Sequence, residues 1–280
     1  MSNASKRQSL LGCMADPYRS WTDYSEGTED LIHLTHEGYR HLSFYPQIMN
    51  LAGLTEEEMS SGKWKASRAD KEIEAGFPTL HAHALLGLWG AFERFIEDVF
   101  VAAIVDAPEI LGGEMFAKLK LPLKVALSSG EERARGIMLE ISRAAGSDSK
   151  TGINQFENIL NYVGLSGVTP PNVRDAVFNA QQVRHVWAHR GGVADEQFVG
   201  RCPSRAKVGD KLMIDIGEFG IYMHGLHMYG ILIMNRHLLN LGEPLVLSEC
   251  EGYKGTWVQI GWTDPSDAPD AQLDDVDDDY

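Results

Sequence analysis

The stretch that decides the fold is PPNVRDAVFNAQQVRHVWAHRGG, residues 170–192. Proline lacks the backbone N–H that the first helical turn leaves unpaired, so Pro170 and Pro171 predict the start of a helix. Glycine readily adopts the left-handed conformation that ends helices, so Gly191 and Gly192 predict its end. The spacing therefore predicts one helix over residues 171–190, about five turns long at 3.6 residues per turn.

One face of this helix carries polar side chains close to its C-terminal end. At 100° per residue, Gln181, His185 and His189 fall on one stripe. Arg184 and His189 are five residues apart, so their Cβ vectors diverge by about 140° on an ideal helix. The two side chains converge only through the length of the arginine, or if a second subunit contributes its own copy.

Outward from this segment, most of the chain also has helical periodicity. A helix is expected after Pro78, and further helices over residues 130–145, 156–163 and 216–241. Upstream, an amphipathic piece starts at Leu31, Pro46 interrupts it, and Thr55 is an expected N-cap. The apolar residues that predict the helix after Pro78 are Leu88, Ala91, Phe92, Phe95, Ile96, Val99 and Phe100.

A small β element is expected near the C-terminal end of the helical region. Gly209-Asp210 lies between apolar stretches and predicts a hairpin that ends in residues 212–214. A strand is also expected over residues 256–262. The predicted organisation is a helical extension over residues 1–75, a helical domain over 76–245, a packed segment over 246–263 and a disordered acidic tail over 264–280.

The charge balance excludes one broad class of function. The chain has 280 residues and a net charge of −15, from 25 Lys and Arg against 40 Asp and Glu. Eight of the acids lie within residues 264–280. A protein that coats nucleic acid needs clustered Lys and Arg, and no basic run is present. A site that binds a few phosphates is still compatible with this composition.

The cysteines and the N-terminus predict a cytoplasmic protein. Cys13, Cys202 and Cys250 form no C-x-x-C pair, so neither a disulfide framework nor a cysteine-based zinc site is expected. The first residues lack the pattern of a secretory signal. The most apolar stretch, residues 219–234, is shorter than the roughly 20 apolar residues of a membrane span. We expect it to form a buried helix and expect no membrane association.

Arg184, a polar residue at position 185 and then His189 resemble the R-x4-6-H motif of the HEPN superfamily. Residues 190–195, RGGVAD, resemble the boundary of that family's motif helix. Upstream, residues 89–98 resemble the first core helix of the RiboL-PSP-HEPN branch, and residues 156–165 resemble the segment before its motif helix. The resemblance covers about residues 78–241. It implies a mainly α fold: a HEPN-type four-helix bundle, here with additional N-terminal helices and a small β element.

The resemblance also implies an activity. Many members are metal-independent endoribonucleases that act as homodimers with a composite site. Carried onto this chain, His189 is the expected general acid or base and Arg184 the phosphate ligand. Histidine exchanges protons near neutral pH, and the arginine fork suits a phosphorane. His185 and Arg190 are expected to support the site or contact substrate, and Glu97 to fix a ring tautomer. No cofactor is expected; RNA is the expected substrate, and an antitoxin or another protein a possible partner.

Other interpretations of the same residues remain open. Arg184 and His189 on their own also fit a surface ion pair and a helix C-cap. His185 and His189, with His224 and His227, have the spacing of helical metal ligands, although the acid of an H-E-x-x-H motif is absent. The family also has noncatalytic members that dimerise or bind nucleotides or partners. The acidic tail is either a solubilising segment or a phosphate mimic that covers the arginine site.

Overall fold

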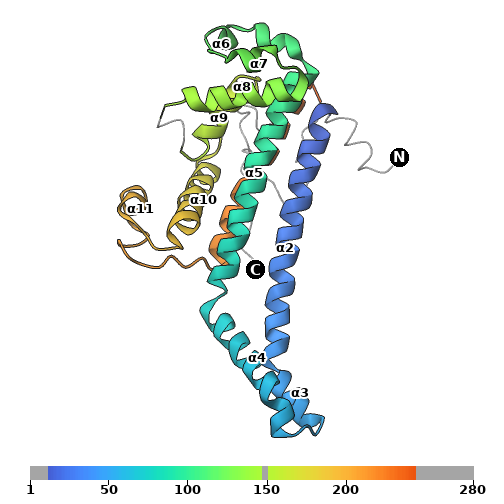
Figure 1. Cartoon of the computed structure of the whole chain (residues 1–280), viewed down its shortest axis with the longest axis vertical. Coiled ribbons are helices and arrows are strands. Elements are labelled where there is room, and N and C mark those ends of the chain that lie inside the picture. Colours follow the sequence, from blue (N-terminus) through green and yellow to red (C-terminus); the bar gives the residue numbers. More distant parts are fainter. Residues whose placement is uncertain (1–11, 147–150, 244–280) are drawn as a thin grey trace, which may run out of the picture. The chain divides into compact units, whose positions relative to one another are not determined.

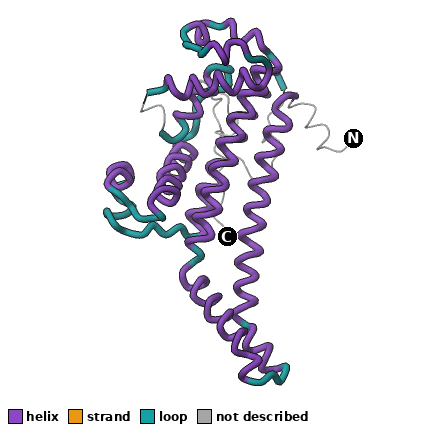
Figure 2. The backbone as a smooth tube through the Cα atoms, viewed as in Figure 1, coloured by secondary structure: helices purple, strands orange, loops and turns teal. Residues whose placement is uncertain are grey.

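The computed structural model describes residues 12–146 and 151–243 of the chain. Within these residues the protein is mainly α, with eleven α-helices and two short 3-10 helices (Figure 1). Figure 2 shows helices and loops, and no strand, in this part of the backbone. The mainly α fold class that the periodicity predicts is therefore confirmed.

Contacts divide the chain into two compact units, each built from segments that are distant in sequence. Unit 2 combines Arg19–Phe95 with Asp175–His227, and unit 1 holds the remaining residues. Four helices contribute residues to both units: α2 (Ala15–Ser43), α5 (Pro78–Asp106), α10 (Pro171–Arg190) and α12 (Ile216–Leu241).

An aromatic cluster from α2 and α5 forms part of the core of unit 2. The ring of Trp21 lies edge-on to Phe92, with 4.9 Å between ring centres, and 6.1 Å from the ring of Phe95. All three side chains are buried. Because α5 begins at Pro78 and buries the expected apolar face, the pattern that predicted this helix is confirmed.

The helix α2 begins well before the position that the sequence predicted. It starts at Ala15, whereas the apolar pattern indicated an amphipathic segment from Leu31. Leu31 and Leu34 are 57% and 68% exposed, and Ser25 and Thr28 are buried. The Thr28 hydroxyl donates to the backbone carbonyl one turn earlier, at 2.8 Å. The apolar pattern does not show the first part of this helix because small polar side chains occupy part of its buried face.

Two shorter helices follow α2 in unit 2. The helix α2 ends at Ser43, and Phe44 separates it from α3, which spans Tyr45–Leu51. Pro46 lies in the first turn of α3, where the missing N–H of proline costs no hydrogen bond. The helix α4 spans Glu56–Ala75, directly after Thr55. The helix start after Thr55 is confirmed, whereas the predicted interruption lies at Phe44, two residues before Pro46, which is itself helical.

Unit 1 contains the shorter helices of the middle of the chain. The predicted helices near residues 130–145 and 156–163 are confirmed as α8 (Gly130–Ala144) and α9 (Asn154–Asn161). The connection from α5 to α8 folds into a 3-10 helix, η2 (Pro108–Gly112), and two short helices, α6 (Glu114–Ala117) and α7 (Leu123–Leu127). The apolar core of this unit includes Ile96, Phe100, Ile137, Ile141, Leu160 and Tyr229.

A buried arginine in α12 organises the loop that leads to α10. Arg236 is only 3% exposed and donates to Oε1 of Glu157 at 2.8 Å. The Tyr229 hydroxyl donates to the same carboxylate at 2.6 Å. Because buried charges need paired and hydrogen-bonded partners, this network holds residues 165–169 in place. The other acceptors of Arg236 are the carbonyls of Leu165 and Val168, both at 3.1 Å, and Oγ1 of Thr169 at 3.2 Å.

The apolar stretch 219–234 lies inside α12, whose bounds match the predicted 216–241. Most of its residues are buried, as expected. A Cβ atom at Gly225 would overlap the Cβ of Ala176, so the glycine permits α12 to approach α10 closely within unit 2. In the described ranges, no helix has the length and apolarity needed to cross a bilayer.

The predicted β hairpin around Gly209-Asp210 is corrected by the structure. The turn exists, with Gly209 at φ +92° and the Asp210 amide donating to Lys207. The residues after it pair with residues 192–194, in a single antiparallel bridge between Val193 and Lys211. The pairing partner is therefore the segment after α10, since the backbone groups of Gly192 and Ala194 form hydrogen bonds with residues 209–212. The expected strand 256–262, the segment 246–263 and the tail 264–280 lie outside the described residues.

Candidate functional site

The candidate site lies at the C-terminal end of α10, in unit 2. The helix starts at Pro171 and ends at Arg190, as predicted. Gly191 and Gly192 have φ values of +59° and +85°, and the Gly192 amide donates to the carbonyl of Val186 at 3.2 Å. This bond spans six residues and closes the helix end while both glycines stay in the left-handed region, which residues with a Cβ rarely adopt. A Cβ at Gly192 would lie 2.8 Å from the Trp187 ring, so position 192 requires glycine for two reasons.

His185 and His189 form a pair of exposed imidazoles on this helix end. Their ring centres are 4.7 Å apart, with 55° between the ring planes. Desolvation lowers the pKa of His185, and repulsion from the charges of His189, Arg184 and Arg201 lowers it further, although Asp195 opposes the shift. His185 is therefore neutral at pH 7 and able to accept a proton.

Arg184 lies against α5 on the same unit. Its Nη2 atom is 3.9 Å from Oε2 of Glu93, and the two side chains are 29% and 46% exposed. Its Nε atom is buried and has no hydrogen-bond partner among the described residues. Because the distance between the two groups is long and both are partly solvated, the ion pair holds Arg184 only weakly. An anion that binds the guanidinium more tightly can therefore replace the carboxylate.

The structure places the two residues with predicted catalytic roles next to different partners. In the described contacts Arg184 pairs with Glu93, and His189 contacts His185. Within one chain they share a helix end but not a contact. The angle of about 140° between their Cβ vectors on an ideal helix predicts this separation. A second copy of the chain is able to place its own Arg184 beside His189.

Arg190 and Asp195 shape the segment that follows α10. Nε of Arg190 lies 3.3 Å from Oδ2 of Asp195, and Oδ1 of Asp195 accepts the Phe198 amide at 2.9 Å. Asp195 is thus the N-cap of α11 (Glu196–Arg201), and that backbone hydrogen bond, followed by Arg190, lowers its pKa. The predicted supporting residue Arg190 is therefore engaged in local structure.

The helix α11 is joined back to α10 by a glutamine pair. Arg201 donates from Nη1 to Oε1 of Gln182 at 3.0 Å, and Gln182 donates to Oε1 of Gln181 at 3.1 Å. Gln182 is buried. These contacts place the charge of Arg201 near His185, where it contributes to the lowered pKa. Sequence analysis did not assign this role, because it depends on α11 folding back against α10.

Lys211 is a second residue that the sequence analysis did not identify. Its ammonium group lies 4.3 Å from the centre of the Trp187 ring and donates to the carbonyl oxygen of Gly191. A cation at this position complements the negative end of the helix dipole. Lys211 therefore fastens the loop 202–215 to the helix end that carries the histidines.

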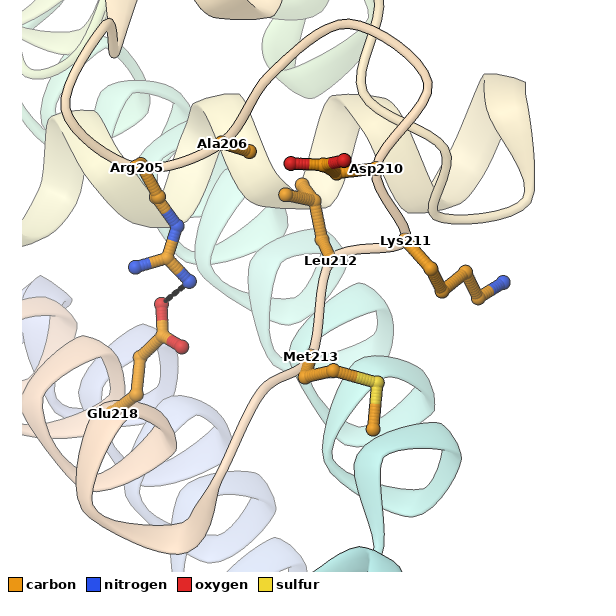
Figure 3. A pocket seen from close by; sticks show the side chains of 7 residues that line it. All are labelled: Arg205, Ala206, Asp210, Lys211, Leu212, Met213 and Glu218. Carbon is orange, nitrogen blue, oxygen red and sulfur yellow. Dashed lines mark ion pairs between the residues drawn. The ribbon is translucent and has the colours of Figure 1, made fainter.

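An open pocket of about 490 Å³ lies beside this loop (Figure 3). Arg205 and Glu218 form an ion pair within it, and the Tyr222 hydroxyl donates to Glu218. Burial and the Glu218 carboxylate raise the pKa of Tyr222 far above its ordinary value, so the phenol stays protonated. The pocket residues are Arg205, Ala206, Asp210, Lys211, Leu212, Met213 and Glu218.

Glu97, the remaining predicted supporting residue, belongs to unit 1. There it accepts a hydrogen bond from Nη1 of Arg135, whose Nη2 also lies 3.3 Å from Asp98 and 3.4 Å from Glu131. These contacts join α5 to α8. The acid that the structure pairs with the motif arginine is Glu93, one turn earlier on α5.

His185 and His189, with His224 and His227, have spacings that also fit a metal site. Burial, followed by repulsion from His224, lowers the pKa of His227. In the part of the chain that the structure describes, no three His, Cys, Asp or Glu residues are grouped as metal ligands. No protein-family model, curated protein or solved structure matches this chain.

Proposed function

We propose that this protein is a metal-independent endoribonuclease whose site is built around His185, His189 and Arg184. One observation carries the proposal: two exposed imidazoles lie 4.7 Å apart on a helix end, and one has a lowered pKa beside two arginines. Proton transfer at neutral pH needs such groups, and a phosphodiester supplies the charge that arginine binds. Membership of the HEPN superfamily is part of this proposal.

The reaction uses the ribose of the substrate as nucleophile. A neutral imidazole, assigned to His185, takes the proton of the 2′-hydroxyl while O2′ attacks phosphorus. The bond from phosphorus to O5′ breaks, and O5′ receives a proton from a protonated imidazole, assigned to His189. Arg184 binds a nonbridging oxygen, where negative charge increases in the transition state. The products are a 2′,3′-cyclic phosphate and a 5′-hydroxyl.

The geometry of this reaction supports a homodimer. In an in-line displacement the attacking and leaving oxygens lie on opposite sides of phosphorus. Two neighbouring rings on one helix end lie on the same side of the phosphorus atom. The general acid and the general base therefore come from two copies of α10. The same arrangement lets Arg184 of one copy serve His189 of the other. Light scattering is expected to give twice the chain mass of 31.0 kDa.

A noncatalytic binding module is the second candidate function. The contact that favours it is the ion pair between Arg184 and Glu93, because the carboxylate competes with a phosphate. The net charge of −15 also opposes strong binding of a polyanion. In this alternative the helix end binds a nucleotide or a partner protein such as an antitoxin, and no RNA is cut.

Cleavage of a mixed RNA pool in EDTA separates the two candidates. Purified protein is compared with the Arg184→Ala, His189→Ala and His185→Asn variants, each confirmed as folded by circular dichroism. The variant His83→Ala, an exposed histidine on α5, is the matched control. Cyclic-phosphate ends made by the parent and the control, and reduced at least roughly 100-fold in the three variants, support the nuclease. Equal cleavage by all proteins, or none, contradicts it.

A further inference from the structure

Unit 1 has a surface of lysines and leucines, none of which is a residue of the candidate site. From Met115 to Gly130 the chain has three lysines and no Asp or Glu, in a protein of net charge −15. Leu123 and Leu127 are 73% and 77% exposed. We call this the Lys–Leu surface; its residues are Lys118, Lys120, Leu123, Lys124 and Leu127, all exposed.

The packing of α7 explains why these leucines face outward. A Cβ at Gly136 of α8 would lie 2.8 Å from Cγ1 of Val125, so α7 approaches α8 closely through Val125. Leu123 and Leu127 are each two residues from Val125, about 200° around the helix. They are four residues apart and share one face. The close contact with α8 therefore fixes an apolar face away from the core of unit 1.

The charges of this surface are not neutralised within the described chain. None of its three lysines forms an ion pair with a described acidic residue. Glu114 and Glu131 flank the segment, and Glu131 is 3.4 Å from Arg135. The surface thus combines positive charge with exposed apolar area, which fits an acidic segment that also carries apolar side chains.

One segment of this chain has that chemistry. Residues 264–280 contain eight Asp and no Lys or Arg. Leu273, Val276 and Tyr280 are spaced by three and four residues between these acids. The apolar spacing matches that of Leu123 and Leu127, and the aspartates complement the lysines. Both the charge and the apolar pattern of residues 264–280 are therefore complementary to the Lys–Leu surface.

We propose that the acidic segment 264–280 docks on the Lys–Leu surface of the same chain. The twenty residues 244–263 that join it to the described structure can extend up to roughly 65 Å. A tether of this kind gives a local concentration in the millimolar range. Weak individual contacts are then sufficient for docking, which also neutralises part of the charge of the segment and removes the exposed leucines from water.

Zero-length carbodiimide cross-linking of the full chain tests this inference. The reagent joins a lysine to an aspartate that contacts it, and mass spectrometry identifies the linked peptides. We expect links between Lys118, Lys120 or Lys124 and residues 264–279, with yields at least about fivefold above those of control lysines, and a loss of the links in about 1 M NaCl. The control lysines are the exposed Lys63, Lys65 and Lys71 of α4.

A double variant and a mixing experiment make the result decisive. Leu123→Ser with Leu127→Ser keeps all lysines and is expected to reduce the linked peptides at least about threefold. A mixture of labelled and unlabelled protein shows whether links form within one chain. Links only between chains, yields equal to those of α4, or preferential links to Lys207 and Lys211 would each overturn the proposal. So would loss of binding to RNA or anionic vesicles on changing the three lysines, without any tail links.

Discussion

The ammonium group of Lys211 lies 4.3 Å from the centre of the Trp187 ring, and the two residues are separated by the whole of α11 and its flanking loops. This contact attaches the loop 202–215 to the end of α10. It therefore helps to define the surroundings of His185 and His189, although neither Lys211 nor Trp187 belongs to the predicted motif.

Replacement of Lys211 by alanine is expected to lower stability by about 1 kcal/mol. The change removes a cation that lies over an aromatic ring and a hydrogen bond to the carbonyl of Gly191, the residue directly after α10. Urea unfolding followed by circular dichroism measures the effect. Lys207→Ala is the control, since the Lys207 ammonium has no partner among the described residues, and it should change stability by less than about 0.5 kcal/mol. Equal effects in both variants would refute the special role of Lys211.

The Arg236→Met variant is expected to lose roughly 3–5 kcal/mol of stability. Removal of the guanidinium leaves the largely buried Glu157 carboxylate without its cation. Chemical unfolding of the single variant and of Arg236→Met with Glu157→Gln provides a double-mutant cycle. The second change should recover part of the loss because no unpaired charge then remains. Strictly additive losses would show that the two residues are not coupled.

The free energy of unfolding is expected to fall as pH decreases below about 6.5. Desolvation, followed by repulsion from His81, lowers the pKa of His36 from its ordinary 6.5, so the unfolded state binds more protons. The contribution is fully present above pH 6.5 and is lost as pH falls through the folded pKa. Urea midpoints at pH 7.5 and 5.5 measure it.

The geometry around His36 supplies the matched variants for this pH test. Its Nε2 lies 3.2 Å from Nε2 of the buried His81, and Nδ1 of His81 lies 2.7 Å from the carbonyl oxygen of Ile214. Since the carbonyl only accepts, His81 donates from Nδ1 and accepts from His36. His36→Gln should reduce the pH dependence, whereas the exposed His83→Gln should leave it unchanged. The opposite ranking would exclude this pair as its source.

Replacement of Glu93 by glutamine is expected to strengthen RNA binding by about two- to fivefold. The carboxylate lies 3.9 Å from Arg184 and competes with a phosphate for that guanidinium. Fluorescence anisotropy with a 2′-O-methyl oligonucleotide, which lacks the nucleophile, measures affinity without cleavage. Glu109→Gln removes the same charge from an exposed site in unit 1, so it controls for net charge. Equal gains in both variants would indicate a general charge effect.

Local signals were sufficient to predict most of the helices. The bounds of α10 follow from Pro170-Pro171 and Gly191-Gly192, because the conformational limits of proline and glycine act within a few residues. The bounds of α12 and the start of α5 follow from periodicity in the same way. The start of α2 could not be predicted like this, since buried serine and threonine side chains gave no apolar pattern.

The sequence by itself therefore determined the mainly α class, the position of α10 and the histidine stripe at its end. Only the tertiary structure decided which partners these residues have. It paired Arg184 with Glu93, folded Lys211 onto Trp187, and paired the turn at Gly209 with residues 192–194 instead of a hairpin neighbour. The physical reason is range. Backbone preferences act between close neighbours, whereas ion pairs and backbone pairing between distant segments form only when packing brings them together.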